Sequence, residues 1–169
     1  MGYAPDFPHA FAKATIGAGD DLPSSGTVLI SVNDNDKRYV VDLAKRCRDL
    51  GFTLLATRGT AAYLQCHGVE AQAINKVVEG SPHVVDYIRE GRIAIAINTP
   101  IGSVAHEDGI DIRRNALRQR VLLLTTMKAA FAAVEAIAAL RTSGFTVESL
   151  QEHYRNSTRE RVTMPSVGM

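Results

Sequence analysis

The sequence predicts an α/β fold: a doubly wound, mostly parallel five-stranded sheet with helices on both faces, in a Rossmann-like three-layer arrangement. Short apolar segments rich in Val, Ile and Leu recur along the chain, and segments with apolar residues at helical spacing separate them. Strands that alternate with helices form right-handed βαβ units and therefore a parallel sheet. The chain has 169 residues, 46% of them hydrophobic, which is enough for one domain with its own core.

Five short apolar segments are the predicted strands. In chain order they are residues 27–32 (TVLISV), 52–56 (FTLLA), 71–75 (AQAIN), 93–98 (IAIAIN) and 121–124 (VLLL). Nearly continuous apolar runs of this kind are typical of parallel strands that are covered on both faces. The sequence contains no internal repeat.

Six helices are predicted around these strands, with Gly51 and Gly91 as C-terminal stops and Pro82 as a start signal. They span residues 37–51, 59–66, 82–91, 112–118, 127–141 and 146–154. The helix over 127–141 has the clearest pattern, because its large apolar residues fall on one face and most of its remaining residues are alanine.

The two ends of the chain differ from this alternation. Residues 1–25 contain a short amphipathic piece around Phe7 and Phe11, followed by TIGAGDDLPSSG, a composition typical of a linker or surface loop. We therefore expect a leader over 1–25, a folded domain over 26–154 and a disordered tail over 155–169.

Composition excludes several classes of function. The formal net charge of +1 gives no overall attraction to nucleic acid or to an acidic membrane. Since no apolar run approaches the roughly 18 residues that a membrane span needs, and MGYAPDFPHAF has no signal-peptide pattern, we expect a cytoplasmic protein. Cys47 and Cys66 are isolated thiols, which fits a reducing compartment. The histidines show no metal-ligand spacing, and we expect no metal, cofactor or catalytic residue in this chain.

Polar residues follow the predicted strands, where ligands bind in open α/β sheets. In ATRGT, after the second strand, Gly59 allows a close approach of the backbone, and Thr57 and Thr60 supply hydroxyl groups beside a helix N-terminus. These features suit a phosphate group, although an ordinary turn capped by threonine accounts for the same residues.

Two lysines flank the same edge of the predicted sheet. Lys37 opens a helix, where a cation is unfavourable for the helix itself, and Lys76 follows the third strand. Asn98 ends the fourth strand and could contact a base or a sugar, or cap the turn that follows. A solvated surface lysine is the alternative for each cation, but their convergence on one edge favours an anion site.

These motifs resemble a known family. SVNDNDK, LLATRGTA, INKVVEGSPHVVDYI, AIAINTP and IRRNALRQRVLLLTT, in that order, resemble the methylglyoxal-synthase-like domain that closes the large subunit of carbamoyl-phosphate synthase. The match covers about residues 26–153, and residues 1–25 resemble the end of the preceding ATP-grasp region and its linker. The resemblance implies a regulatory domain that binds a nucleotide effector such as UMP or IMP, or N-acetylglutamate in some relatives.

The resemblance also implies partners and site residues. The parent enzyme uses ATP with Mg or Mn to make carbamoyl phosphate, and its partners would be the ATP-grasp body, a glutaminase small subunit and possible further copies of itself. The implied phosphate contacts are Ser31, Lys37, Thr57, Gly59, Thr60 and Lys76, with Asn98 and Thr99 at the ribose or base end. The chain departs from the best-known bacterial pattern at Pro100, Ser103 and Val104, which replace a threonine and two arginines.

Two other functions remain as alternatives. A stand-alone methylglyoxal synthase needs a carboxylate that removes a carbon-bound proton, and that family's catalytic aspartate falls at Ser81, which cannot take this role. An effector-independent structural or oligomerisation domain is the second alternative, because the altered segment after Thr99 could have disabled the site.

Overall fold

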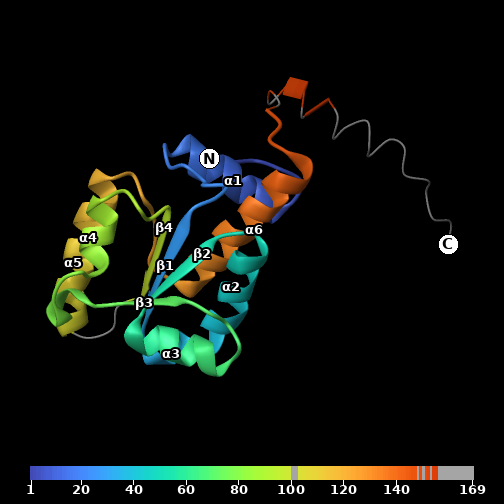
Figure 1. Cartoon of the computed structure of the whole chain (residues 1–169). Helices are drawn as coiled ribbons and strands as arrows, with labels where there is room; N and C mark the ends of the chain where they lie inside the picture. Colours follow the sequence, from blue (N-terminus) through green and yellow to red (C-terminus); the bar gives the residue numbers. More distant parts are fainter. Residues whose placement is uncertain (100–102, 148, 150, 153, 156–169) are drawn as a thin grey trace.

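One five-stranded, all-parallel sheet organises the chain (Figure 1). The structure is a computed structural model that describes residues 1–99, 103–147, 149, 151–152 and 154–155. The strand order is β3-β2-β1-β4-β5, and each neighbouring pair is parallel. The strands are β1 (Thr27–Val32), β2 (Thr53–Thr57), β3 (Gln72–Ile74), β4 (Ile95–Thr99) and β5 (Leu122–Leu124). The predicted fold class is confirmed. β1 has the predicted ends, and the ends of the other four strands differ from the prediction by at most two residues.

Helices cover both faces of this sheet. The helices are α1 (Phe7–Gly17), α2 (Lys37–Asp49), α3 (Arg58–Cys66), α4 (Val84–Arg89), α5 (Ser103–Arg118) and α6 (Met127–Ser143), with short 3-10 turns η1 (Asp34–Asp36) and η2 (Val77–Glu79). In Figure 1, α4 and α5 lie together on one side of the sheet, whereas α2 and α6 lie on the other. The arrangement is therefore the predicted three-layer one. In the described part of the chain, no helix is both long and apolar enough to cross a membrane.

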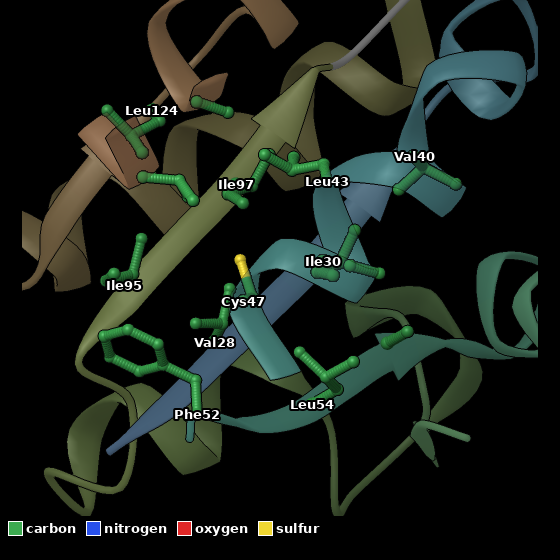
Figure 2. Close-up of a cluster of buried hydrophobic side chains, with 14 of the residues drawn as sticks. Val28, Ile30, Val40, Leu43, Cys47, Phe52, Leu54, Ile95, Ile97 and Leu124 are labelled. Carbon is green, nitrogen blue, oxygen red and sulfur yellow. The ribbon is translucent and has the colours of Figure 1, made fainter. Parts of the chain in front are cut away.

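Alternation along the strands separates two hydrophobic cores. Val28 and Ile30 of β1 point into the core shared with α2, α3 and α6, part of which Figure 2 shows, whereas Leu29 points into the core under α4 and α5. All three side chains have no exposed surface. Apolar residues on both faces explain why the strands read as continuous apolar runs in the sequence.

Two helices differ from the sequence prediction. The helix predicted over 112–118 in fact begins at Ser103. The sequence prediction missed its first turns because they contain polar residues and Gly109 and show no apolar period. The first residues of the predicted linker, 15–17, are instead the end of α1. Asp6 begins α1 by accepting a hydrogen bond from the backbone N–H of His9 at 2.9 Å, and Pro8 lies in the first turn, where proline is tolerated.

The predicted final helix over 146–154 includes residues 148, 150 and 153, which lie outside the described residues, and so does the predicted tail from 156 onward.

The leader lies against α6 (Figure 1). Ala12 of α1 is fully buried, and Phe11 packs against the core that contains α6. His9 Nε2 lies 2.8 Å from the Ser143 hydroxyl at the end of α6. Arg141 of α6 donates hydrogen bonds to the backbone carbonyls of Ser24 and Leu50. The segment before β1 is thus held to α6 at both of its ends.

The connections place a switch point between β1 and β4. After β1 the chain moves outward to β2 and β3, then returns to the other side of β1 to form β4. The helix after β1 lies on one face and the helix after β4 on the other (Figure 1). Helices that leave in opposite directions open a crevice at the carboxyl ends of these two strands, and ligands of open α/β sheets bind in such crevices.

Candidate functional site

The eight predicted contact residues all lie at the carboxyl edge of the sheet or in the turns that leave it. Ser31 is in β1, and Lys37 begins α2. Thr57 ends β2, and Gly59 and Thr60 lie in the first turn of α3. Lys76 follows β3, and Asn98 and Thr99 end β4.

The amino group of Lys37 lies beside the first turn of α3. A Cβ atom added to Gly59 would stand 3.7 Å from Lys37 Nζ, so the ammonium and the α3 backbone are close neighbours. The Lys37 side chain retains 25% of its exposure. A helix N-terminus with free N–H groups and an adjacent cation is suited to bind an anion.

Two buried hydroxyl groups lie in the same turn. Thr57 and Thr60 are 3% and 1% exposed, and their hydroxyl oxygens are 3.2 Å apart. Within such a pair one hydroxyl donates to the other, which leaves the second proton for another acceptor. The pair can therefore donate one hydrogen bond to a ligand oxygen at this edge.

Asn98 carries an unsatisfied donor. The residue is 4% exposed, and among the residues that the structure describes its Nδ2 has no hydrogen-bond partner. Asn98 lies opposite Ser31 in the β1–β4 register, so it sits at the switch point. A buried donor without an acceptor costs about 1–3 kcal/mol, and a ligand that supplies the acceptor removes this cost.

Asn33, which the sequence analysis missed, fixes the end of β4. Its Nδ2 lies 2.9 Å from the Thr99 carbonyl oxygen, 3.0 Å from the Thr99 hydroxyl and 2.6 Å from Asp36 Oδ2. The turn after β1 is thereby tied to the neighbouring strand. The Thr99 hydroxyl already accepts bonds in this tie, which leaves only its proton for a ligand.

Asp34 is a second residue that sequence reasoning missed. Its Oδ1 lies 2.7 Å from Lys37 Nζ, at i,i+3 spacing, and its side chain is 89% exposed. The hydrogen bond and charge of Lys37 lower the pKa of the Asp34 carboxyl below its ordinary value, and the charge of Lys76 lowers it further. The charges of both lysines therefore lower the pKa of the same carboxyl, at the carboxyl edge of the sheet.

Asp86 organises the turn before α4, near the end of β3. Its Oδ2 accepts hydrogen bonds from the His83 backbone N–H at 3.0 Å and from the Ser81 hydroxyl at 2.8 Å. These bonds, with the His83 N–H first, lower the pKa of the Asp86 carboxyl. His83 Nδ1 lies 3.2 Å from the same oxygen without forming a hydrogen bond to it. Ser81 thus supports the turn by donating its hydroxyl proton to Asp86.

Several other features lie away from this edge or outside the description. A surface hollow lined by Thr53, Gln65 and Gln72 lies at the opposite, amino end of β2 and β3. Within the described residues, no three His, Cys, Asp or Glu side chains are grouped as metal ligands. Pro100 lies outside the described residues, and the side chains of Ser103 and Val104 are not described either.

The fold and this edge define an open, doubly wound α/β domain with lysines, hydroxyl groups and a buried amide at its carboxyl edge. Residues 39–125 match the family of MGS-like domains, in which MGS stands for methylglyoxal synthase, and the chain belongs to this family. The resemblance noted in the sequence is confirmed.

Similar curated proteins are carbamoyl phosphate synthase large chains. The chain is 46% identical over 166 residues to the carbamoyl phosphate synthase large chain, C-terminal section, of Methanopyrus kandleri, an alignment that covers 98% of the chain and 31% of that protein. It is 47% identical over 153 residues to the large chain of Myxococcus xanthus and 50% identical over 151 residues to that of Acidobacterium capsulatum. These alignments cover 90% and 89% of the chain and 14% of each relative. The chain thus spans less than a third of the length of these relatives, and the alignment that covers 98% of it includes part of the leader.

Proposed function

We propose that the chain is the allosteric regulatory domain of a carbamoyl-phosphate synthase large subunit. In this role it binds a phosphate-bearing effector of the UMP or IMP type and modulates ATP-dependent synthesis of carbamoyl phosphate from bicarbonate and glutamine-derived ammonia. The reaction itself would take place in the ATP-grasp body, with Mg or Mn, and a glutaminase small subunit would supply the ammonia. The names of the similar proteins support the assignment to this enzyme.

The position of Lys37 carries the proposal of effector binding. Its ammonium lies beside Gly59 at the N-terminus of α3, with the Thr57–Thr60 hydroxyl pair in the same turn. A phosphate group placed here would accept bonds from the ammonium, from a hydroxyl and from backbone N–H groups, and charge-assisted bonds of this kind are the stronger ones. Lys76 would add a second cation. The nucleoside would then extend toward the crevice at Asn98 and Thr99.

The effector would act on the catalytic body through linkage. Binding must favour one arrangement of this domain relative to the body, with a coupling free energy of about 1–3 kcal/mol. The leader is a candidate route, because it would join the domain to the ATP-grasp body and because α1 is held to α6. The chain by itself would bind the effector without regulating anything.

The test is a calorimetric titration of the chain with UMP, IMP, N-acetylglutamate and inorganic phosphate. We expect saturable binding of one nucleotide, competed by phosphate. A chain with Lys37→Ala and Thr60→Ala together should lose this binding and keep its circular dichroism spectrum. Lys45→Ala is the matched control, because it removes an exposed cation from the same helix α2 without touching the site.

Gly59→Ala tests the same site by steric means. The added methyl group would lie 3.7 Å from Lys37 Nζ, an ordinary contact, so the fold should tolerate it. Alanine also favours the helix over glycine by up to about 1 kcal/mol. We therefore expect unchanged or higher thermal stability together with weaker phosphate binding. Normal binding by both altered chains would show that the assigned site is wrong, and absence of binding by the unaltered chain would favour an effector-independent structural or oligomerisation domain.

A further inference from the structure

The Lys37 ammonium is already paired with an anion of the same chain. Asp34 Oδ1 lies 2.7 Å from Lys37 Nζ, and the two residues are three positions apart across the start of α2. The same ammonium lies beside Gly59 at the N-terminus of α3. A carboxylate therefore contacts the cation that a ligand phosphate would need.

Asp34 and Asp36 differ in how firmly they are held. Asp36 is tied by the Asn33 side chain through two bonds, one of 2.6 Å to its carboxylate and one of 3.1 Å from its backbone N–H. Asp34 is 89% exposed, and in the described part of the chain its carboxylate is paired with Lys37. Hence the Asp34 side chain can rotate into solvent without disturbing the turn, whereas the Asp36 side chain cannot.

We infer that Asp34 lowers the affinity of the effector site for anions. Its carboxylate is paired with the Lys37 ammonium in the ligand-free chain and must leave before a phosphate group binds there. This inference rests on the proposed function. An exposed ion pair is weak, so displacement is easy and the site stays usable. Displacement nevertheless raises the dissociation constant of every anion that uses Lys37, because the ligand must compete with an internal carboxylate that is always present.

The competition keeps weakly bound anions off the site. Two cations and a helix N-terminus without Asp34 would attract any abundant small anion. With Asp34 present, a ligand that gains further contacts, such as those at Thr60 and Asn98, displaces the carboxylate more readily than an anion that uses Lys37 alone. Asp34 would also remain near the bound phosphate and repel it, which adds to the effect.

Asp34→Asn tests the inference because it keeps the size and the polar character of the side chain and removes its charge. The altered chain is titrated with inorganic phosphate and with UMP, and it should bind both about three- to tenfold more tightly than the unaltered chain. This range reflects the loss of a weak exposed ion pair and of the repulsion between the Asp34 carboxylate and the bound phosphate. Its affinity should also fall more steeply with added salt, since the site then carries one more net positive charge. Asp49→Asn, which makes the same charge change at the far end of α2, should alter the affinity less than twofold.

The outcomes separate this inference from the proposed function. If the unaltered chain binds and Asp34→Asn binds equally or more weakly, Asp34 positions Lys37 or plays no part, and the inference is overturned while the proposed function stands. Binding by the Asp34→Asn chain alone would support the inference and contradict the proposed function, because the unaltered chain would then bind no effector. If neither chain binds phosphate or UMP, the proposed function fails, and the inference fails with it.

Discussion

The two cysteine residues should differ in reactivity, because only one of them is buried. Cys47 lies on α2 within the core shown in Figure 2 and has no exposed surface, whereas Cys66 at the end of α3 is exposed. Burial in an apolar core raises the pKa of the Cys47 thiol from an ordinary 9.0 to about 12. Since the thiolate is the reactive form, Cys47 should be inert in the folded chain.

A thiol-reactive reagent such as a disulfide dye should therefore count one fast thiol in the native chain and two in denaturant. Cys66→Ser should abolish the fast reaction, and Cys47→Ser should leave it unchanged.

The raised pKa of the Cys47 thiol also makes the stability of the fold depend on pH. The contribution of the neutral Cys47 thiol is fully present below its unfolded pKa and is lost as the pH rises toward about 12, because only the unfolded chain then releases the proton. Two fast thiols in the native chain would contradict the buried position of Cys47.

The strand-end residues of the candidate site were predictable because parallel strands bring their carboxyl ends to one edge. Thr57, Lys76 and Asn98 therefore fell at the same edge without any knowledge of side-chain positions. Asn33 and Asp34 were not singled out, because a polar run such as NDND is common in turns and names no partner. Their roles depend on contacts with Thr99 and Lys37, of which only the i,i+3 spacing of Asp34 and Lys37 was visible in the sequence.

At the element scale, the leader helix α1 depends on a small polar network. Asp6 accepts from the His9 backbone N–H, its carboxylate lies 2.8 Å from His9 Nδ1, and His9 Nε2 lies 2.8 Å from the Ser143 hydroxyl. The arrangement has the order of a Ser–His–Asp triad, but Ser143 lies at the C-terminal end of α6 and also contacts the Ala139 carbonyl oxygen. Helix carbonyls would repel an oxyanion, so the network is a tie between two helices.

His9→Ala should loosen α1 without unfolding the sheet. Both the link to Ser143 and the partner of Asp6 are lost, so amide hydrogens of α1 should exchange several-fold faster while those of β1 and β4 keep their rates. Hydrogen exchange followed by mass spectrometry measures this difference, and Lys128→Ala, an exposed change in the first turn of α6, is the control. Equal exchange of α1 in the His9→Ala chain would show that apolar packing alone holds the leader.

The same network gives a pH dependence with a definite sign. The His9 backbone N–H first, and then its ring, lower the pKa of the Asp6 carboxyl. A carboxyl with a lowered pKa contributes stability that is present above its unfolded value and is lost as the pH falls through the folded value. Protection of the α1 amides, measured relative to their intrinsic exchange rates, should therefore hold above an ordinary carboxyl pKa of 3.8 and fall below it.

The helices that sequence reasoning misjudged share a physical cause. Most of α1 outside Phe11 and Ala12 lacks a strong apolar period, and its C-terminal residues precede a glycine-rich stretch, so TIG was read as part of a linker. The start of α5 contains few large apolar residues and a glycine, so the sequence shows no clear apolar period there. Strands buried on both faces, such as β1 and β4, left no such ambiguity.

At the scale of the whole molecule, the candidate site exists only when the sheet is assembled. Lys37 and the α3 turn come from the β1 and β2 units, whereas Asn98 comes from β4, beyond β3 and α4 in the chain. Two cores, one on each face, hold these units together through the shared strands. A ligand bound at this edge therefore binds the folded chain and not the unfolded one, so its binding free energy adds to the stability of the entire domain.

Ligand-dependent melting measures this coupling. At a concentration of a bound nucleotide one hundred times its dissociation constant, the expected stabilisation is about 2.7 kcal/mol. For a domain of this size that corresponds to a rise in melting temperature of about 5–11 °C. The Lys37→Ala, Thr60→Ala chain should show no rise, because it no longer binds, while Lys45→Ala should behave as the unaltered chain does. A nucleotide that binds by calorimetry yet leaves the melting temperature unchanged would have to bind folded and unfolded chains equally, which would place its contacts outside the assembled edge of the sheet.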